Sequence, residues 1–285
     1  MKYVYYNPYS GDGSGKALAE SLTELYGEDM TVVNMVEIPD IAAFSQALSA
    51  SDRIVICGGD GTINRFVNSV DADRLSAEVY YLPAGTGNDF AVDLGLAGAK
   101  EPFDIKPYII GLPTVTVMGK EYKFINGVGY GIDGYCCEVG DALKANGKKP
   151  NYTAIAIKGL LIGYKPKDAT VIIDGKEYFF KKAWIAPTMH GRYYGGGMNA
   201  APEQKRGSEE LSLMLFSGSG KLSTLMAFPK IFTGEHVTKK MVTVLTGKEI
   251  TVKFSAPSPL QIDGETVLGV TEYTAKAAVK VKAAE

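Results

Sequence analysis

The chain has 285 residues, enough for two modest domains or one large one, and its apolar (46%) and charged (22%) fractions are those of an ordinary globular protein. This composition excludes a disordered chain, a fibre and a disulfide-stapled miniprotein. Lys and Arg (30) nearly balance Asp and Glu (32), and the formal charge of −2 provides no net basic field, so we expect no nucleic-acid partner.

The first hundred residues alternate strand and helix signals. Short runs of β-branched, aromatic or apolar residues predict strands at 2–6, 31–36, 53–57 and 78–82. Apolar residues at helical spacing predict helices between these strands, most clearly from Ile63 to Val70. Repeated βα units predict an α/β domain, in which a parallel sheet carries helices on its faces and binds ligands beyond the carboxyl ends of its strands.

The pattern changes after about Pro102, because short alternating runs separated by turns such as Asp174-Gly175 then dominate. These runs predict strands at 114–117, 122–126, 169–174, 178–187, 211–216 and 248–254, with helices around 135–143 and 153–164. We therefore expect an α/β domain at residues 1–112 and an antiparallel β-sandwich-like domain at 113–271. For the segment from about 272 to 285, a return to the first domain stays open.

Cysteine usage and hydropathy predict a cytoplasmic protein. Cys57 and the adjacent pair Cys136 and Cys137 make a poor disulfide framework, which indicates a reducing compartment. The N-terminal residues lack the apolar stretch of a signal peptide, and no apolar run approaches the roughly 20 residues that a membrane span needs. The sequence gives no oligomeric state, and a homodimer is compatible with it.

Three glycine-rich loops follow predicted strands, at residues 7–16, 58–62 and 85–89. Each loop lies where a strand brings backbone N–H groups to the start of a helix, and glycines let phosphate oxygens approach the main chain. One such loop is explained equally well as a tight turn. Three of them together, two with an aspartate among the glycines, favour phosphate binding.

The first of these loops is not a Walker loop. Only three residues separate Gly11 from Gly15-Lys16, and Ala17 stands where that pattern requires Ser or Thr. No segment after a predicted strand fits G-x-G-x-x-G either. An ordinary P-loop and a Rossmann dinucleotide site are therefore both disfavoured.

The string Gly58-Gly59-Asp60-Gly61-Thr62 resembles the signature that diacylglycerol kinases, sphingosine kinases and NAD kinases share. Further blocks resemble motifs of the lipid kinases in the same order: Asn7-Pro8-x-Ser10-Gly11, Leu82–Ala91, Phe124–Gly131, Gly195–Met198 followed by Ala201-Pro202, and Asp263-Gly264-Glu265. NAD kinases lack the Leu82–Ala91 block. By this resemblance the chain is identified as a member of the bacterial diacylglycerol kinase-like lipid kinases, with an NAD kinase-like first domain.

The resemblance implies an ATP-dependent transfer of the γ-phosphate to the hydroxyl of diacylglycerol or a related long-chain lipid alcohol, with Mg²⁺, at the inner face of a membrane. It implies that Glu265 is the general base and that Asp263 belongs to the same catalytic block, which can also form a hairpin turn. Asp60 and Asp89 would bind Mg²⁺, directly or through water, unless they only cap helices. The residues implied in nucleotide binding are Asn7, Ser10, Gly58, Gly59, Asp60, Gly61, Thr62, Thr86 and Asn88.

The sequence departs from the family pattern at residues 207–212. An Asp-Gly-x-Leu-Asp pattern that helps to bind a structural divalent ion is replaced there by Gly207-Ser208-Glu209-Glu210-Leu211-Ser212, so we expect that metal site to be missing. Two alternatives stay open: a kinase of another acceptor, such as a dinucleotide, and a nucleotide- or lipid-binding module that has lost catalysis. A further segment, Leu222–Phe232 between Lys221 and Lys230, either packs onto its own domain or faces a membrane surface.

Overall fold

The computed structural model describes residues 1–8, 14–85 and 87–278. It divides into two compact units, Met1–Leu112 and Pro113–Glu285, each of which is described by itself. Among the described residues, no helix has both the length and the apolar character needed to cross a membrane.

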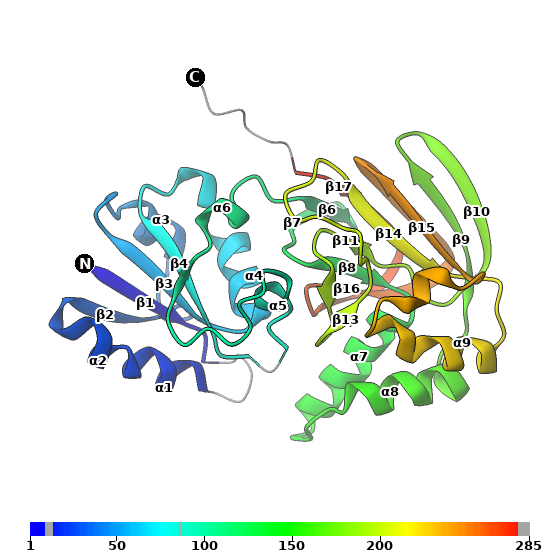
Figure 1. The fold of residues 1–285 in the computed structure, drawn as a ribbon, viewed down its shortest axis with the longest axis horizontal. Helices are drawn as coiled ribbons and strands as arrows, with labels where there is room; N and C mark the ends of the chain where they lie inside the picture. The colour runs from blue at the N-terminus through cyan, green and yellow to red at the C-terminus, as the bar shows by residue number, and fades with distance from the viewer. Residues whose placement is uncertain (9–13, 86, 279–285) are drawn as a thin grey trace. The chain divides into compact units, whose positions relative to one another are not determined.

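The first unit is a five-stranded sheet in the order β2-β1-β3-β4-β5 (Figure 1). Four of its strands are parallel, and the short β5 pairs antiparallel with β4. The strands are β1 (Lys2–Tyr6), β2 (Met30–Asn34), β3 (Arg53–Gly58), β4 (Glu78–Pro83) and β5 (Phe103–Asp104). The helices are α1 (Ser14–Ser21), α2 (Thr23–Tyr26), α3 (Ile41–Gln46), α4 (Asp60–Ser69), α5 (Asp89–Asp93) and α6 (Lys106–Ile109), with 3₁₀ turns η1 (Gly27–Asp29) and η2 (Ala72–Arg74).

Helices cover both faces of this sheet because successive side chains of a strand point to opposite sides. The fully buried Tyr5 ring meets Phe44 of α3 and Phe66 of α4 on one face. Its neighbour Val4 packs on the other face in a cluster that includes Ala19 of α1. The predicted α/β class of the first domain is confirmed by this arrangement.

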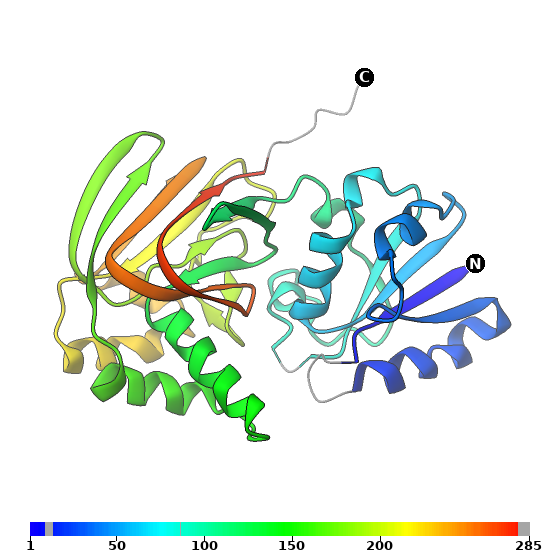
Figure 2. The same ribbon diagram turned by 180° about the vertical axis from the view of Figure 1, so that it is seen from behind.

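The second unit is built on a ten-stranded sheet whose described pairings are all antiparallel (Figures 1 and 2). Its main path runs β15-β14-β11-β8-β16-β17-β6-β7, and β9 joins β16 to β10. These strands are β6 (Thr114–Val117), β7 (Lys120–Lys123), β8 (Gly127–Tyr130), β9 (Lys167–Ile173), β10 (Lys176–Ala183), β11 (Thr188–Met189), β14 (Leu211–Phe216), β15 (Val242–Gly247), β16 (Glu249–Ile262) and β17 (Glu265–Lys276). A separate small hairpin joins β12 (Tyr193–Tyr194) to β13 (Met198–Asn199).

Helical segments pack on this sheet. They are α7 (Ile132–Ala145), α8 (Tyr152–Lys158) with the π-helical turn η3 (Gly159–Gly163), α9 (Lys221–Ala227), and the 3₁₀ turns η4 (Phe228–Ile231) and η5 (Glu235–Thr238). Gly134 lets α7 approach β16 closely, because a Cβ there would collide with the carbonyl of Pro259. The predicted antiparallel, sandwich-like class of the second domain is confirmed.

Three predicted strands are wrong in their bounds, and the one expected at 248–254 continues to Ile262 in β16. The one expected at 122–126 spans the gap between β7 and β8, because the N–H groups of Ile125 and Asn126 bond to the side chain of Asp263. The one expected at 178–187 stops at Ala183, after Lys182 adopts a φ of 53° that breaks the ladder. Residues 272–276 pair with β16 and β6, so as far as Lys276 the C-terminal segment does not return to the first unit.

Candidate active site

The three glycine-rich loops leave one edge of the first sheet. They follow β1, β3 and β4, which are adjacent and parallel, so all three leave at the carboxyl ends of the strands. Gly15, at the start of α1, lies beside the carbonyl oxygens of Asn7 and Cys57, at 3.7 and 3.6 Å from the position of a Cβ, so the packing there would also admit a Cβ. Ser10 and Thr86 lie outside the described residues.

The second and third loops touch backbone to backbone. A Cβ on Gly85 would lie 2.7 Å from Cα of Gly59, and a Cβ on Gly59 would lie 3.2 Å from Cα of Gly85. The N–H of Ala84 also donates to the Gly58 carbonyl at 2.8 Å. The contact of the loops thus excludes a Cβ at Gly85 and makes one at Gly59 tight, whereas the Cβ position of Gly61 is open.

We expect Gly85→Ala to lower the free energy of unfolding by about 1–3 kcal/mol, because the added methyl pushes the two loops apart. The matched control is Gly61→Ala, which adds the same methyl in α4 where nothing lies within 4 Å. Urea unfolding followed by circular dichroism compares the two. Equal stability of the two variants would contradict the close contact.

Asn88 closes the third loop on itself. Its side-chain oxygen accepts the N–H of Gly85 at 3.0 Å, and its amide donates to the Gly85 carbonyl at 2.6 Å. Its φ of 48° is left-handed, a conformation that asparagine tolerates better than most residues. The predicted nucleotide-binding residue Asn88 therefore has a clear role in shaping the loop.

Asp60 joins the second loop to the helix that follows the third. Its two carboxylate oxygens accept the N–H groups of Asp89 and Phe90 at 2.8 and 2.9 Å, which satisfies the start of α5. The alternative that Asp60 caps its own helix is wrong, since α4 begins at Asp60 and the capped helix is α5. Asp89 is buried in the first turn of α5.

The Asp60 carboxylate has the donor chemistry of a magnesium ligand that also binds phosphate. Each Asp60 oxygen keeps a lone pair after accepting one N–H, and Mg²⁺ is usually held by one or two carboxylates together with substrate phosphates. In the described part of the chain, no group of three or more His, Cys, Asp or Glu is placed to hold a metal by itself. A carboxylate in the first turn of α4 would repel phosphate unless a cation lay between them.

Two other predicted nucleotide-binding side chains point inward. Thr62 is fully buried, and its hydroxyl lies so close to Gly58 that a Cβ added on Gly58 would collide with it. Asn7 is also buried, at the end of β1. Gly59, Asp60 and Gly61 remain half-exposed, so the accessible part of the second loop is its backbone around α4's first turn.

The Asp263-Gly264 pair forms a two-residue hairpin loop between β16 and β17. Ile262 pairs with Glu265, and both loop residues have positive φ values of 46° and 97°. Such values are typical of a type I′ turn, in which Asp-Gly is a preferred pair. The predicted hairpin at this motif is therefore present in the structure.

Asp263 anchors the loop to the segment before β8. Its carboxylate accepts the N–H groups of Ile125, Asn126 and Gly127 at 2.6, 2.8 and 3.0 Å. Its own N–H donates to the Gly127 carbonyl at 3.1 Å. These bonds give Asp263 a role in positioning the loop, and a catalytic role for Asp263 stays a prediction.

Glu265 is the first residue of β17 and its side chain is exposed. It lies two residues after the anchored Asp263, so the turn fixes where this strand begins. The adjacent Thr266 donates from its hydroxyl to Asp141 of α7 at 2.7 Å. Its exposure makes the carboxylate accessible, as a general base must be.

Two family models match the chain. The diacylglycerol kinase catalytic domain matches residues 2–111, and the YegS C-terminal NAD kinase beta sandwich-like domain matches residues 126–281, more than half of the sequence. The chain belongs to the bacterial diacylglycerol kinase-like lipid kinase family.

Curated relatives agree with this family. The chain is 25% identical over 281 residues to a diacylglycerol kinase of Mycobacterium tuberculosis, with 90% of this chain and 89% of that protein covered. It is 26% identical over 273 residues to a diacylglycerol kinase of Bacillus subtilis, with 92% and 88% covered. A crystal structure described as a diacylglycerol kinase from Bacillus anthracis matches with a TM-score of 0.61 at 17% identity, covering 98% and 94%, and this likeness supports the fold.

Two polar residues, Asp133 and Arg206, have structural roles that the sequence did not predict. Asp133, in the first turn of α7, is buried and accepts the Tyr194 hydroxyl at 2.6 Å. Its burial raises its pKa from the usual 3.8 to about 7, although the Tyr194 hydrogen bond opposes the shift. Arg206 donates to the side-chain oxygen of Asn126 at 2.9 Å, beside the segment that Asp263 holds. The only sequence signal for Asp133 was a lone charge between the apolar Ile132 and Gly134.

Residues 207–212 lead into β14 of the second sheet. The Glu209 carboxylate is 3.7 Å from Lys248, and the backbone carbonyl of Glu210 accepts the Gln204 amide at 3.0 Å. Gln204 in turn accepts the hydroxyl of Ser212 at 2.5 Å. The absence of the structural metal site stays a prediction.

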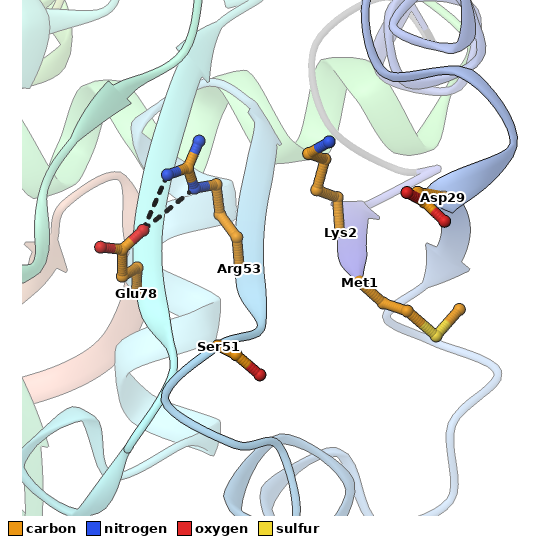
Figure 3. Close-up of a pocket in the computed structure, with 6 residues that line it drawn as sticks. All are labelled: Met1, Lys2, Asp29, Ser51, Arg53 and Glu78. Carbon is orange, nitrogen blue, oxygen red and sulfur yellow. Dashed lines mark hydrogen bonds and ion pairs between the residues drawn. The ribbon is translucent and has the colours of Figure 1, made fainter.

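A charged depression lies at the other end of the first sheet (Figure 3). Its lining includes Lys2 and Arg53, which begin β1 and β3, so it is at the amino ends of the strands, away from the glycine loops. Arg53 donates to Glu78 through two nitrogens at 2.8 and 3.1 Å. This ion pair ties β3 to β4, and the depression is separate from the candidate site.

Proposed function

We propose that this family member is an ATP-dependent kinase that transfers the γ-phosphate to the hydroxyl of diacylglycerol or a related long-chain lipid alcohol. The observation that carries the proposal is the contact of two glycine loops, at Gly59 and Gly85, beside the start of α4. We infer that ATP phosphates bind there, on the backbone of Gly58, Gly59 and Gly61. The motif match of the chain with lipid kinases supports a lipid acceptor.

Asp60 and Asp89 are the proposed residues for Mg²⁺. When bound, the ion would neutralise phosphate charge, as phosphoryl transfer generally requires. Asp60 is held by two N–H groups of α5, so its oxygens are fixed while one lone pair on each stays available. Ser10, Thr86, Asn7, Thr62 and Asn88 complete the proposed nucleotide-binding set, with Asn7 and Thr62 acting from buried positions that shape the loops.

Glu265 is the proposed general base. Its carboxylate accepts the proton of the lipid hydroxyl as that oxygen bonds to the γ-phosphorus and the bond from phosphorus to ADP breaks. Asp263 acts through Glu265 by fixing the hairpin. We place this activity in the cytoplasm, in transient contact with the inner face of a membrane.

The test is a transfer assay with ATP labelled in the γ-phosphate, Mg²⁺, and three conditions: diacylglycerol in mixed micelles, NAD, and no acceptor. We expect label in the lipid extract alone. Label in NAD would show that the protein is a dinucleotide kinase and not a lipid kinase. No transfer to either acceptor, with ATP binding intact by calorimetry, would identify a binding module without catalysis.

A further inference from the structure

Three buried polar side chains lie next to one another in the interior of the second unit. They are Gln261 of β16, Asp133 of α7 and Tyr194 of β12, and we call them the buried polar line. Burying such groups costs free energy unless each of them binds another polar group. Their partners therefore indicate what the line does.

Gln261 holds the hairpin loop that precedes Glu265. Its side-chain oxygen accepts the N–H of Gly264 at 2.6 Å, and its backbone pairs with Thr266 of β17. Asp263 thus fixes the first side of the loop and Gln261 the second. Because one end of an amide accepts and the other end donates, this bond turns the Gln261 nitrogen away from the loop.

The Gln261 nitrogen meets Asp133 at Gly129 of β8. A Cβ on Gly129 would lie 2.5 Å from that nitrogen and 2.6 Å from a carboxylate oxygen of Asp133, so both atoms border the same gap. Glycine is needed there, because any side chain would separate the two groups. An amide nitrogen donates and a carboxylate oxygen accepts, so Asp133 favours the orientation in which the Gln261 oxygen faces Gly264.

The same carboxylate also reaches a second loop of the unit. Asp133 accepts the Tyr194 hydroxyl at 2.6 Å, and Tyr194 directly precedes Gly195-Gly196-Gly197. These glycines have φ values of 63°, 83° and 102°, which other residues rarely adopt, and the first two are exposed. One buried carboxylate thus joins two surface loops, one of which leads into the proposed base.

Helix α7 holds Asp133 near that base. The helix packs on β16 and β17 (Figure 2), and its Asp141 accepts the Thr266 hydroxyl at 2.7 Å. Burial raises the pKa of the Cys137 thiol, one turn after Asp133, and the charges of Asp133 and Glu265 both add to this shift. Both carboxylates therefore lie close to one thiol of α7.

We propose that Asp133 and Gln261 are positioning residues for the base Glu265, and that Tyr194 connects them to the glycine loop at 195–197. The inference rests on the proposed function, since it assigns a task to groups behind the proposed base. None of the three touches the reactants. They act through the hairpin, by holding the strand end from which Glu265 projects.

The proton state of Asp133 sets how firmly the hairpin is held. Ionised, its carboxylate only accepts hydrogen bonds, and it can accept from Tyr194 and from the Gln261 amide together. Protonated, it carries a donor of its own on one oxygen, so the Gln261 amide loses part of its reason to keep one orientation. The Gly264 N–H is then held less firmly, and we expect transfer to be slower.

Asp133 is the group of this line that titrates near neutral pH. Its burial raises its pKa to about 7. Burial also raises the pKa of the titratable groups that face it, to about 12 for Cys137 and Tyr164, so all of them stay neutral; they are Tyr194 of β12, Cys136 and Cys137 of α7, Tyr164 after η3 and Tyr273 of β17. The charged groups Asp141, Lys144 and Glu265 face the neighbouring Cys137.

The first test uses neither ATP nor acceptor. The nitrogen chemical shift of the Gly264 amide is followed by NMR as pH rises through about 7. We expect one transition at about pH 7 in the wild type, a transition at higher pH in Tyr194→Phe, and none in Asp133→Asn or Gln261→Met. A wild-type shift that does not change, or a transition that persists in Asp133→Asn, would overturn the proposal.

The second test is a kinetic cycle with the base. Gln261→Met and Asp133→Asn should each lower kcat about tenfold at an unchanged KM for ATP, because a misplaced base transfers protons less efficiently. In a Glu265→Gln background neither change should lower kcat further, since no base is left to position. Additive losses in the double variants would mean that these residues do not act through Glu265, and would overturn the proposal.

The matched control is Gln204→Met. Gln204 is also a buried amide of the second unit, but it accepts the Ser212 hydroxyl and donates to the Glu210 carbonyl instead of binding the hairpin. Urea unfolding should show a loss of stability like that of Gln261→Met, at wild-type kcat and with the Gly264 transition kept. An equal loss of kcat in the control would mean that kcat follows stability alone, and would overturn the positioning role.

The two tests separate this inference from the proposed function. Absence of transfer by the wild type would refute the kinase proposal, and the titration of the Gly264 amide would still decide whether Asp133 reaches the hairpin. Transfer by the wild type without a transition at Gly264 would keep the kinase and overturn the buried polar line as a positioning device.

Discussion

Glu265→Gln is expected to lower kcat for phosphoryl transfer by about 10²–10⁴-fold, the usual contribution of a positioned general base. The amide has the shape of the carboxylate but cannot accept the proton of the acceptor hydroxyl. The free energy of unfolding should not change, because Glu265 is exposed at the first position of β17. Steady-state kinetics with Mg²⁺-ATP, calorimetry of ATP binding and urea unfolding measure the three quantities. Transfer at the wild-type rate would show that another residue is the base.

Asp263→Asn, two residues earlier, is the matched comparison and, unlike Glu265→Gln, should lower stability as well as kcat, because Asp263 fixes the hairpin that positions Glu265. One oxygen becomes a donor that cannot accept an N–H, so at least one of the amides of Ile125, Asn126 and Gly127 is left without its partner. The expected loss of stability is about 1–3 kcal/mol. Loss of kcat at unchanged stability would instead mean that Asp263 acts on the reactants directly.

The local patterns along the chain predicted most of the first unit. Strand and helix alternate there at short range, and the parallel order of β1, β3 and β4 follows from βα connections. The second unit was harder to predict because its strands pair over long distances. The predicted strand at 122–126 shows the reason. Apolar Ile125 and polar Asn126 alternate as in a strand, but their N–H groups bond to the side chain of Asp263, almost 140 positions later.

The candidate site could also be predicted only in part. Its glycines were predictable, since a backbone that meets another backbone or a phosphate excludes other residues. The partners of its carboxylates were not, because spacing alone cannot say that Asp60 would accept the N–H groups of the next loop's helix. Asp133 was missed for a related reason: a single aspartate gives no sign in the sequence that it will be buried.

The burial of Asp133 predicts a distinctive pH dependence of stability. Its pKa is raised from 3.8 to about 7 in the folded protein, so between these values the folded state holds a proton that the unfolded state has released. Stability therefore falls as pH rises from about 4 to about 7 and is constant above that, by about 4 kcal/mol in total at 1.36 kcal/mol per pKa unit. The nearby Cys137 and Tyr164 stay neutral in this range, because burial raises the pKa of each to about 12.

Asp133→Asn isolates this contribution, because the amide stays neutral at every pH and still accepts the Tyr194 hydroxyl. The stability of the variant relative to the wild type should rise by about 4 kcal/mol from pH 4 to pH 8, measured by urea unfolding at each pH. Tyr194→Phe removes the hydrogen bond that favours the ionised carboxylate, so the titration should move to higher pH. A difference that stays constant over this range would mean that Asp133 ionises as an exposed carboxylate does, and that burial in α7 is compensated by a cation.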